Sequence, residues 1–87
     1  MKFRDLIFGT MDLCRIFYWQ EKYTLHTSLH NFESDGTMHK SLEVTIFERC
    51  EIVAKFHIAD YLDDAENLDA YNGFRNWVGE NLVNVNY

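Results

Sequence analysis

Residues 42–58, LEVTIFERCEIVAKFHI, decide the fold of this 87-residue chain because they hold two runs of alternating apolar residues. Such alternation is typical of a strand with one buried face. The apolar residues are Leu42, Val44 and Ile46 in the first run, and Ile52, Ala54, Phe56 and Ile58 in the second. The pattern therefore predicts an antiparallel hairpin with strands over 42–48 and 52–58.

The loop of this hairpin determines which residues face one another. A two-residue turn would oppose Ile46 to Val53 and turn one apolar face to water. A three-residue loop at 49–51 pairs Ile46 with Ala54 and keeps both apolar runs on one face. We therefore predict the three-residue loop, which also leaves Phe47 opposite Val53 as an apolar pair on the other face of the sheet.

The N-terminal part of the chain admits two interpretations. Residues 1–8 fit a short amphipathic helix, with Gly9 as its C-terminal stop. Residues 13–19 contain consecutive aromatic side chains, which favour a strand. The helical period also fits a longer helix that continues as far as Tyr18. We expect the strand, because Gly9 interrupts the helical pattern.

The middle of the chain supplies a further strand and a loop. Residues 22–29 alternate in polarity and read as a strand. Residues 31–41 read as a loop, because 34–37 (Ser-Asp-Gly-Thr) are turn residues. The exposed apolar pair Phe47 and Val53 then forms either an interface or part of a second small core beneath this loop.

From Asp60 onward the apolar spacing changes to that of a helix. Asp60 suits the N-cap position. The apolar stripe comprises Tyr61, Ala65, Leu68, Tyr71, Phe74, Val78 and Leu82, with Trp77 at its border. In the tail, Val83, Val85 and Tyr87 alternate with asparagines and fit a short edge strand.

Together these elements predict one α+β domain over residues 1–87. We expect a four-stranded antiparallel sheet, a short N-terminal helix, and a long acidic C-terminal helix packed on one face of the sheet. Cys14 and Cys50 are too few for a disulfide framework, although a single bridge between them stays open. Because no segment resembles a signal peptide, we expect a cytoplasmic protein.

The negative charge is concentrated at the predicted C-terminal helix. Residues 1–59 carry seven Lys/Arg and eight Asp/Glu, a balance of −1, whereas residues 60–87 carry one and six, a balance of −5; the two sum to −6. The acids that begin this segment are Asp60, Asp63, Asp64, Glu66 and Asp69. Either they form a face for a basic partner, in place of nucleic-acid phosphates, or they complement the positive end of the helix dipole.

No catalytic, metal or cofactor motif stands out in the sequence. His26 and His30 lie about 13 Å apart if they are in a strand, too far to share a metal ion. His57 is expected opposite Glu43 as a structural cross-strand pair. We therefore expect no enzyme activity, no cofactor and no bound metal. Lys and Arg do not cluster, which argues against direct binding of nucleic acid.

The order of elements resembles that of small phage-encoded proteins. Residues 4–7 (Arg-Asp-Leu-Ile), the antiparallel strands and the acid-rich helix make the chain most similar to the small acidic anti-CRISPR inhibitors of type II-A Cas9. This resemblance implies a non-enzymatic inhibitor whose carboxylates occupy the DNA-binding, often PAM-reading, groove of its target.

The sequence thus predicts a phage or mobile-element protein that inhibits a host nucleic-acid-handling protein. The acidic helix would bind a basic groove, and Phe47 and Val53 would supply apolar anchors. Two alternatives stay open. One is a self-associating structural or regulatory protein, for instance a homodimer, or an immunity or antitoxin-like binding protein; the other is a small metal or ligand site around His26, His30 and His57.

Overall fold

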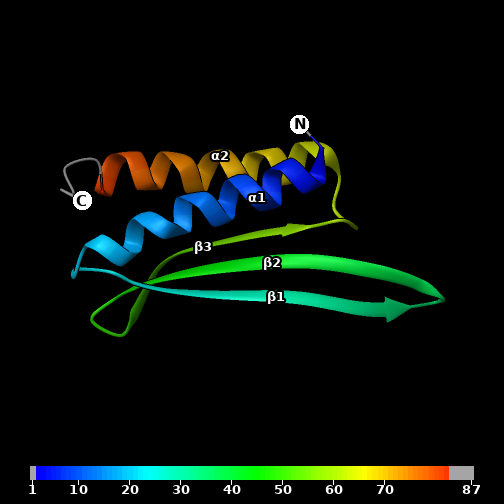
Figure 1. The fold of residues 1–87 in the computed structure, drawn as a ribbon, viewed down its shortest axis with the longest axis horizontal. Helices are drawn as coiled ribbons and strands as arrows, with labels where there is room; N and C mark the ends of the chain where they lie inside the picture. Colours follow the sequence, from blue (N-terminus) through cyan, green and yellow to red (C-terminus); the bar gives the residue numbers. More distant parts are fainter. Residues whose placement is uncertain (1, 83–87) are drawn as a thin grey trace.

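Three antiparallel strands in the order β1-β2-β3 carry two helices on one face, in a computed structural model that describes residues 2–82 (Figure 1). The elements are α1 (Phe3–Cys14), the 3-10 helix η1 (Arg15–Trp19), β1 (Thr24–Ser34), β2 (Thr37–Glu48), β3 (Glu51–Ala59) and α2 (Asp64–Asn81). The α+β class is confirmed, whereas the prediction of four strands is wrong, because residues 13–19 are helical. The edge strand predicted from Val83, Val85 and Tyr87 lies outside the described residues.

Residues 15–19 form a 3-10 helix that buries one of its three aromatic rings. Phe17 is buried and stacks on Phe74 and Trp77 of α2, with ring centroids 6.1 and 5.9 Å apart. Tyr18 and Trp19, which follow it, remain exposed. Gly9 does not end α1; a Cβ there would lie 2.9 Å from the Tyr71 ring, so the glycine lets α2 approach closely. The longer-helix interpretation was therefore the right one.

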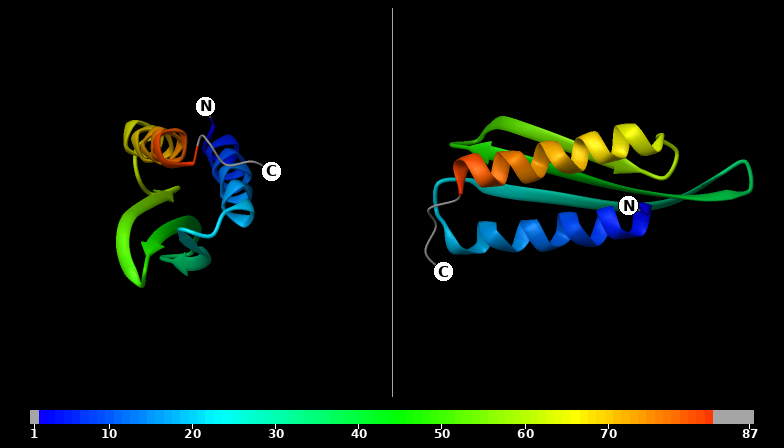
Figure 2. Two further views of the ribbon diagram at one scale, coloured as in Figure 1. Left: turned by 90° about the vertical axis from the view of Figure 1, so that its left-hand side faces the viewer. Right: turned by 90° about the horizontal axis from the view of Figure 1, so that it is seen from above.

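The β1–β2 hairpin is longer than predicted. Its turn has only two residues, Asp35 and Gly36, with φ of 53° and 78°. Positive φ at both central residues is the geometry that suits a two-residue hairpin, and Asp-Gly is a preferred sequence for it. Residues 31–34 and 37–41, predicted as loop, are therefore strand. The end of this hairpin projects beyond the helices (Figure 2).

The β2–β3 hairpin has the predicted register but not the predicted loop. Ile46 pairs with Ala54, as expected. The turn, however, contains only Arg49 and Cys50, both with positive φ. The extra residue is taken up by an irregularity in the ladder between Ile46 and Phe47, so Phe47 pairs with Ile52. The predicted Phe47–Val53 pair is therefore wrong.

The core lies between the sheet and the two helices, which run in the same direction (Figures 1 and 2). Its buried side chains are Phe17, Leu42, Val44, Ile46, Phe74, Val78 and Leu82. The first half of the predicted stripe is wrong, because Ala65 and Leu68 are exposed and Asn67 is buried in their place. The Asn67 amide explains this: it accepts from the Ala59 N–H and donates to the Ala59 carbonyl, at 3.0 and 2.8 Å. These bonds hold the start of α2 to the end of β3.

Candidate functional site

The acidic cluster (Asp60, Asp63, Asp64, Glu66 and Asp69) lies where β3 ends and α2 begins. The N-terminus of α1 is at the same end of the molecule, because the two helices run in parallel (Figure 1). The positive ends of both helix dipoles therefore point to this end, which favours carboxylates there. Asp5 in the first turn of α1 adds another one.

Asp60 has a structural task that the sequence did not reveal. Its carboxylate accepts a 3.0 Å hydrogen bond from the Lys40 N–H and lies 3.2 Å from Nδ1 of His39. The Asp60 N–H in turn donates to the Lys40 carbonyl at 3.0 Å. Asp60 thus fastens the end of β3 to the projecting hairpin, and it is not the N-cap of α2.

Asp63 is the N-cap of α2. Its side chain accepts a 2.7 Å hydrogen bond from the Glu66 N–H. Asp63 also raises the pKa of the fully exposed Glu66 carboxyl, first because its carboxylate can accept a hydrogen bond from the protonated Glu66 side chain and second because of its negative charge. Two carboxylates therefore repel one another at the start of the helix, and a cation placed beside them would be favoured.

Asp64, Glu66 and Asp69 have no cationic partner in the part of the chain that the structure describes. Within residues 2–82 the ion pairs join Arg15 to Asp12, His39 to Asp60 and Lys55 to Glu43. Glu66 and Asp69 are spaced i,i+3 and share one exposed side of α2, whereas Asp64 lies on another side. The acidic cluster therefore contains two carboxylates with structural hydrogen bonds, those of Asp60 and Asp63, and three others that are exposed on α2.

An aromatic cluster (Phe32, His39, His57 and Tyr61) adjoins Asp60 on the face of the sheet that the helices leave uncovered. Its ring centroids are 5.5 Å apart for Phe32–His39, 6.1 Å for Phe32–Tyr61 and 6.1 Å for His57–Tyr61. Phe32 and Tyr61 are 41% and 51% exposed. Neither side chain was predicted to lie on this surface, because the sequence pattern placed Phe32 in a loop and Tyr61 in the core stripe. Counting back from the Asp35-Gly36 turn would have paired Phe32 with His39.

Phe47 and Val53 do not join the acidic cluster. They lie beside the β2–β3 turn, at the far end of β3 from Asp60, and seven residues of strand span roughly 23 Å. Val53 is 45% exposed, and Phe47 is half-buried beside His26. The structure therefore places the predicted acids together and the predicted apolar anchors elsewhere, and the exposed rings beside Asp60 are Phe32 and Tyr61.

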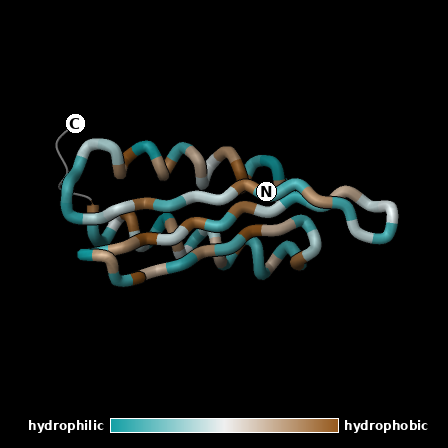
Figure 3. Tube along the Cα trace, turned by 90° about the horizontal axis from the view of Figure 1, so that it is seen from below, coloured by the Kyte–Doolittle hydropathy of each residue, from teal (hydrophilic) through white to brown (hydrophobic). Residues whose placement is uncertain are grey.

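The histidines and cysteines occupy separate positions. The strand register puts all four histidines on the uncovered face, which Figure 3 views directly; they are His26, His30, His39 and His57. Among residues 2–82, no three His, Cys, Asp or Glu side chains come together as a group able to hold a metal ion. Both cysteines are free thiols, and burial raises the pKa of Cys14 to about 11, so that this thiol is protonated at neutral pH.

Comparisons with known proteins give this chain no relatives. No protein-family model, no curated protein and no solved structure matches it. In the part of the chain that the structure describes, neither helix has the length and apolar character needed to cross a membrane.

Proposed function

We propose that this protein is a non-enzymatic inhibitor that binds the basic groove of a host nucleic-acid-handling protein. The three exposed acids of α2 would provide the attraction. The observation that carries the proposal is that Asp64, Glu66 and Asp69 have no cation within ion-pair distance among residues 2–82, although they lie at one end of a chain with a net charge of −6.

The neighbouring aromatic side chains support a protein target. Electrostatic attraction raises affinity mainly by speeding encounter, and buried aromatic anchors supply much of the remaining binding energy at interfaces. Phe32 and Tyr61 present such rings beside Asp60. A basic groove with an apolar pocket at its rim would fit this pair of surfaces.

The partner class follows from charge and from the resemblance noted in the sequence. A groove that binds nucleic acid is lined with Arg and Lys, which gain affinity from each anionic contact. A Cas effector of type II-A is the specific target that we propose, with the chain acting as an anti-CRISPR protein of phage or mobile-element origin. In that case binding would exclude DNA from the groove.

The test compares two triple variants with equal net charge. The first is Asp64→Asn, Glu66→Gln and Asp69→Asn, and the matched control is Asp12→Asn, Glu48→Gln and Glu51→Gln, which neutralises three exposed or half-buried acids outside the acidic cluster. Fluorescence anisotropy with guide-loaded type II-A Cas9 measures binding. We expect the first triple to bind about tenfold more weakly than the control.

Two further measurements separate the parts of the proposal. Binding of the unchanged protein should weaken as salt is added, and Phe32→Ala should lower affinity without changing that salt dependence. PAM-containing DNA should compete with the protein for Cas9. Equal affinities of the two triple variants would reject the α2 acids as the binding surface, and failure of DNA to compete would reject the groove.

A further inference from the structure

Two neighbouring apolar hollows lie between α1 and the sheet, on the side of the molecule away from α2, and we refer to them together as the groove. Its wide end is a cavity of about 440 Å³ beside Phe3 and Ile7, and its narrow end is a hollow of about 180 Å³ beside Met11 and Cys14. Leu29 lines both. The groove widens because α1 and β1 diverge toward the N-terminus of α1 (Figure 1).

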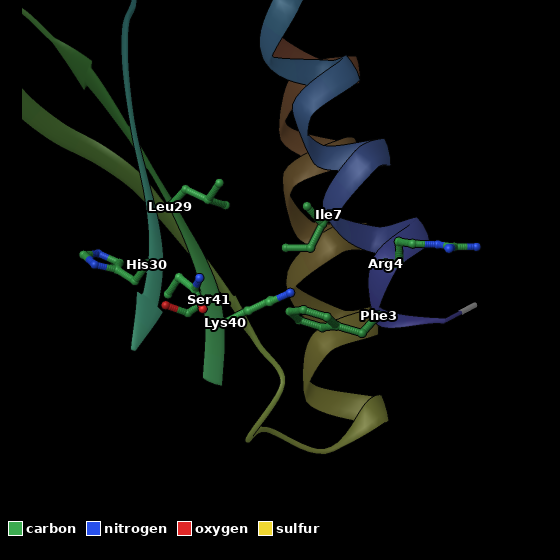
Figure 4. Close-up of a pocket in the computed structure, with 8 residues that line it drawn as sticks. Phe3, Arg4, Ile7, Leu29, His30, Lys40 and Ser41 are labelled. Carbon is green, nitrogen blue, oxygen red and sulfur yellow. The ribbon is translucent and has the colours of Figure 1, made fainter. Parts of the chain in front are cut away.

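The side chains in the groove leave an apolar surface uncovered. Phe3 and Ile7 point into the gap from α1, and Leu29 points into it from β1 (Figure 4). Leu29 is 68% exposed, although it lies on the face of the sheet that carries the core. A volume of this size, lined by apolar side chains and a few polar ones, is typical of small-molecule sites.

The charged side chains that line the groove are all positive. Lys40 extends from β2 into the gap toward Phe3, whereas Arg4 and His30 line the cavity with side chains that point away (Figure 4). None of the 14 acidic residues of the chain lines either part of the groove. A lone ammonium group at the edge of an apolar surface favours a ligand with one anionic group and an apolar body.

The groove has the length of a medium acyl chain. It follows the 12 residues of α1, which rise about 18 Å. An extended hydrocarbon chain of roughly a dozen carbons spans a comparable distance at ordinary bond lengths. Among the described residues, the narrow end is lined by Met11, Cys14, Thr27, Leu29 and Leu42, none of which carries a charge that would disfavour a methyl terminus.

We propose that this groove binds a medium-chain fatty acid, with its carboxylate on Lys40 and its chain between α1 and β1. The carboxylate would accept hydrogen bonds from the Lys40 ammonium group, and the chain would cover Leu29 and Ile7. The site uses none of the acidic-cluster side chains. Failure to bind a fatty acid would therefore not contradict the proposed inhibitor function, and loss of the inhibitor function would not contradict this site.

Titration of the full chain with dodecanoate, below its micelle concentration, tests the site by NMR. We expect saturable shifts of the Ile7, Leu29 and Leu42 methyl resonances. Lys40→Met should weaken binding about tenfold, and the matched control Lys55→Met, on the opposite face of the sheet, should leave it unchanged. Leu29→Glu should abolish the shifts, whereas Leu68→Glu on α2 should not.

Each other outcome overturns the proposal. Binding of dodecanol or dodecyltrimethylammonium as tight as that of dodecanoate would show that the groove does not select a carboxylate. A concentration-dependent dimer that shifts the same methyl resonances without ligand would show that a second copy of the chain fills the groove. Absence of shifts in a chain whose circular dichroism is native would show that the groove stays empty.

Discussion

Single residues in this protein serve local needs that polarity alone does not reveal. Asn67 is polar yet buried, because its amide completes the backbone hydrogen bonds of Ala59. Asp60 and Asp63 are acidic, yet each satisfies N–H groups of the backbone. Such roles depend on which residues the fold brings together. The sequence could therefore indicate the acidic cluster, but not which of its carboxylates make structural hydrogen bonds and which remain free to bind a partner.

Thr10 is the residue for which a substitution should help. Its side chain is buried, and its hydroxyl oxygen has no hydrogen-bond partner among the described residues. A buried polar group without a partner costs free energy, whereas an apolar group of the same shape does not. We expect Thr10→Val to raise the free energy of unfolding by about 1 kcal/mol in urea denaturation.

Thr10→Ser is the control for this prediction. It keeps the hydroxyl and removes the methyl group, so it should lower the free energy of unfolding by about 1 kcal/mol. A loss of stability in Thr10→Val would show that the hydroxyl does have a partner in solution.

At the scale of elements, the apolar alternation of residues 42–58 was enough to predict the pairing of β2 with β3. The register was right because burying one face tolerates no slip of one residue. The predicted length of the turn was wrong, because a two-residue turn followed by an irregularity in the ladder gives the same register as a three-residue loop. The helical state of residues 13–19 could not be derived from their composition, since it depends on contacts of Phe17 with α2.

Glycines in the two helices have different tasks, although their local sequence does not show it. Within residues 2–82, a Cβ at Gly79 would meet nothing within 4 Å, whereas one at Gly9 would lie 2.9 Å from the Tyr71 ring. Gly79→Ala should therefore raise the free energy of unfolding by about 0.5–1 kcal/mol, through helix propensity. Gly9→Ala gains the same propensity but must displace the ring, and we expect it to be destabilising.

Denaturant midpoints of the two variants, measured side by side, check this prediction. If Gly9→Ala were as stabilising as Gly79→Ala, the contact between α1 and the Tyr71 ring would not constrain the packing of the two helices.

At the scale of the whole molecule, charge and apolar surface are distributed unevenly. One end carries the acidic and aromatic clusters, and the groove beside α1 carries Lys40. The sequence predicted the charge asymmetry, because it is a property of composition along the chain. It did not predict the groove, because the stripe of α1 that lines it looks like any core-facing stripe until the divergence of α1 from β1 is known.

The two cysteines offer a probe of global unfolding. Cys50 is exposed in the β2–β3 turn, whereas Cys14 is half-buried at the end of α1. We expect a maleimide reagent at neutral pH to modify Cys50 in the native protein and Cys14 only upon unfolding, since the thiolate is the reactive form. Mass spectrometry of timed samples distinguishes the two sites.

The Cys14 thiol also predicts a pH dependence. Burial raises its pKa from 9.0 to about 11, so the folded state holds this proton more tightly than the unfolded state. The contribution to stability is full below pH 9 and is lost as the pH rises from 9 toward about 11. Cys14→Ala should lack this alkaline loss in thermal melts, and an identical loss in that variant would assign it to other groups.

The pairing of α1 with α2 joins the first helix of the chain to the last. The Gly9–Tyr71 contact spans 62 residues, whereas each hairpin of the sheet closes over two. On the ribosome, α1 is synthesised first but must wait for α2 to emerge before it gains its partner. The chain contains no proline, so no isomerisation step delays that meeting. The emergence of α2, and not an intrinsically slow bond rotation, should therefore set the moment at which the two helices pack together.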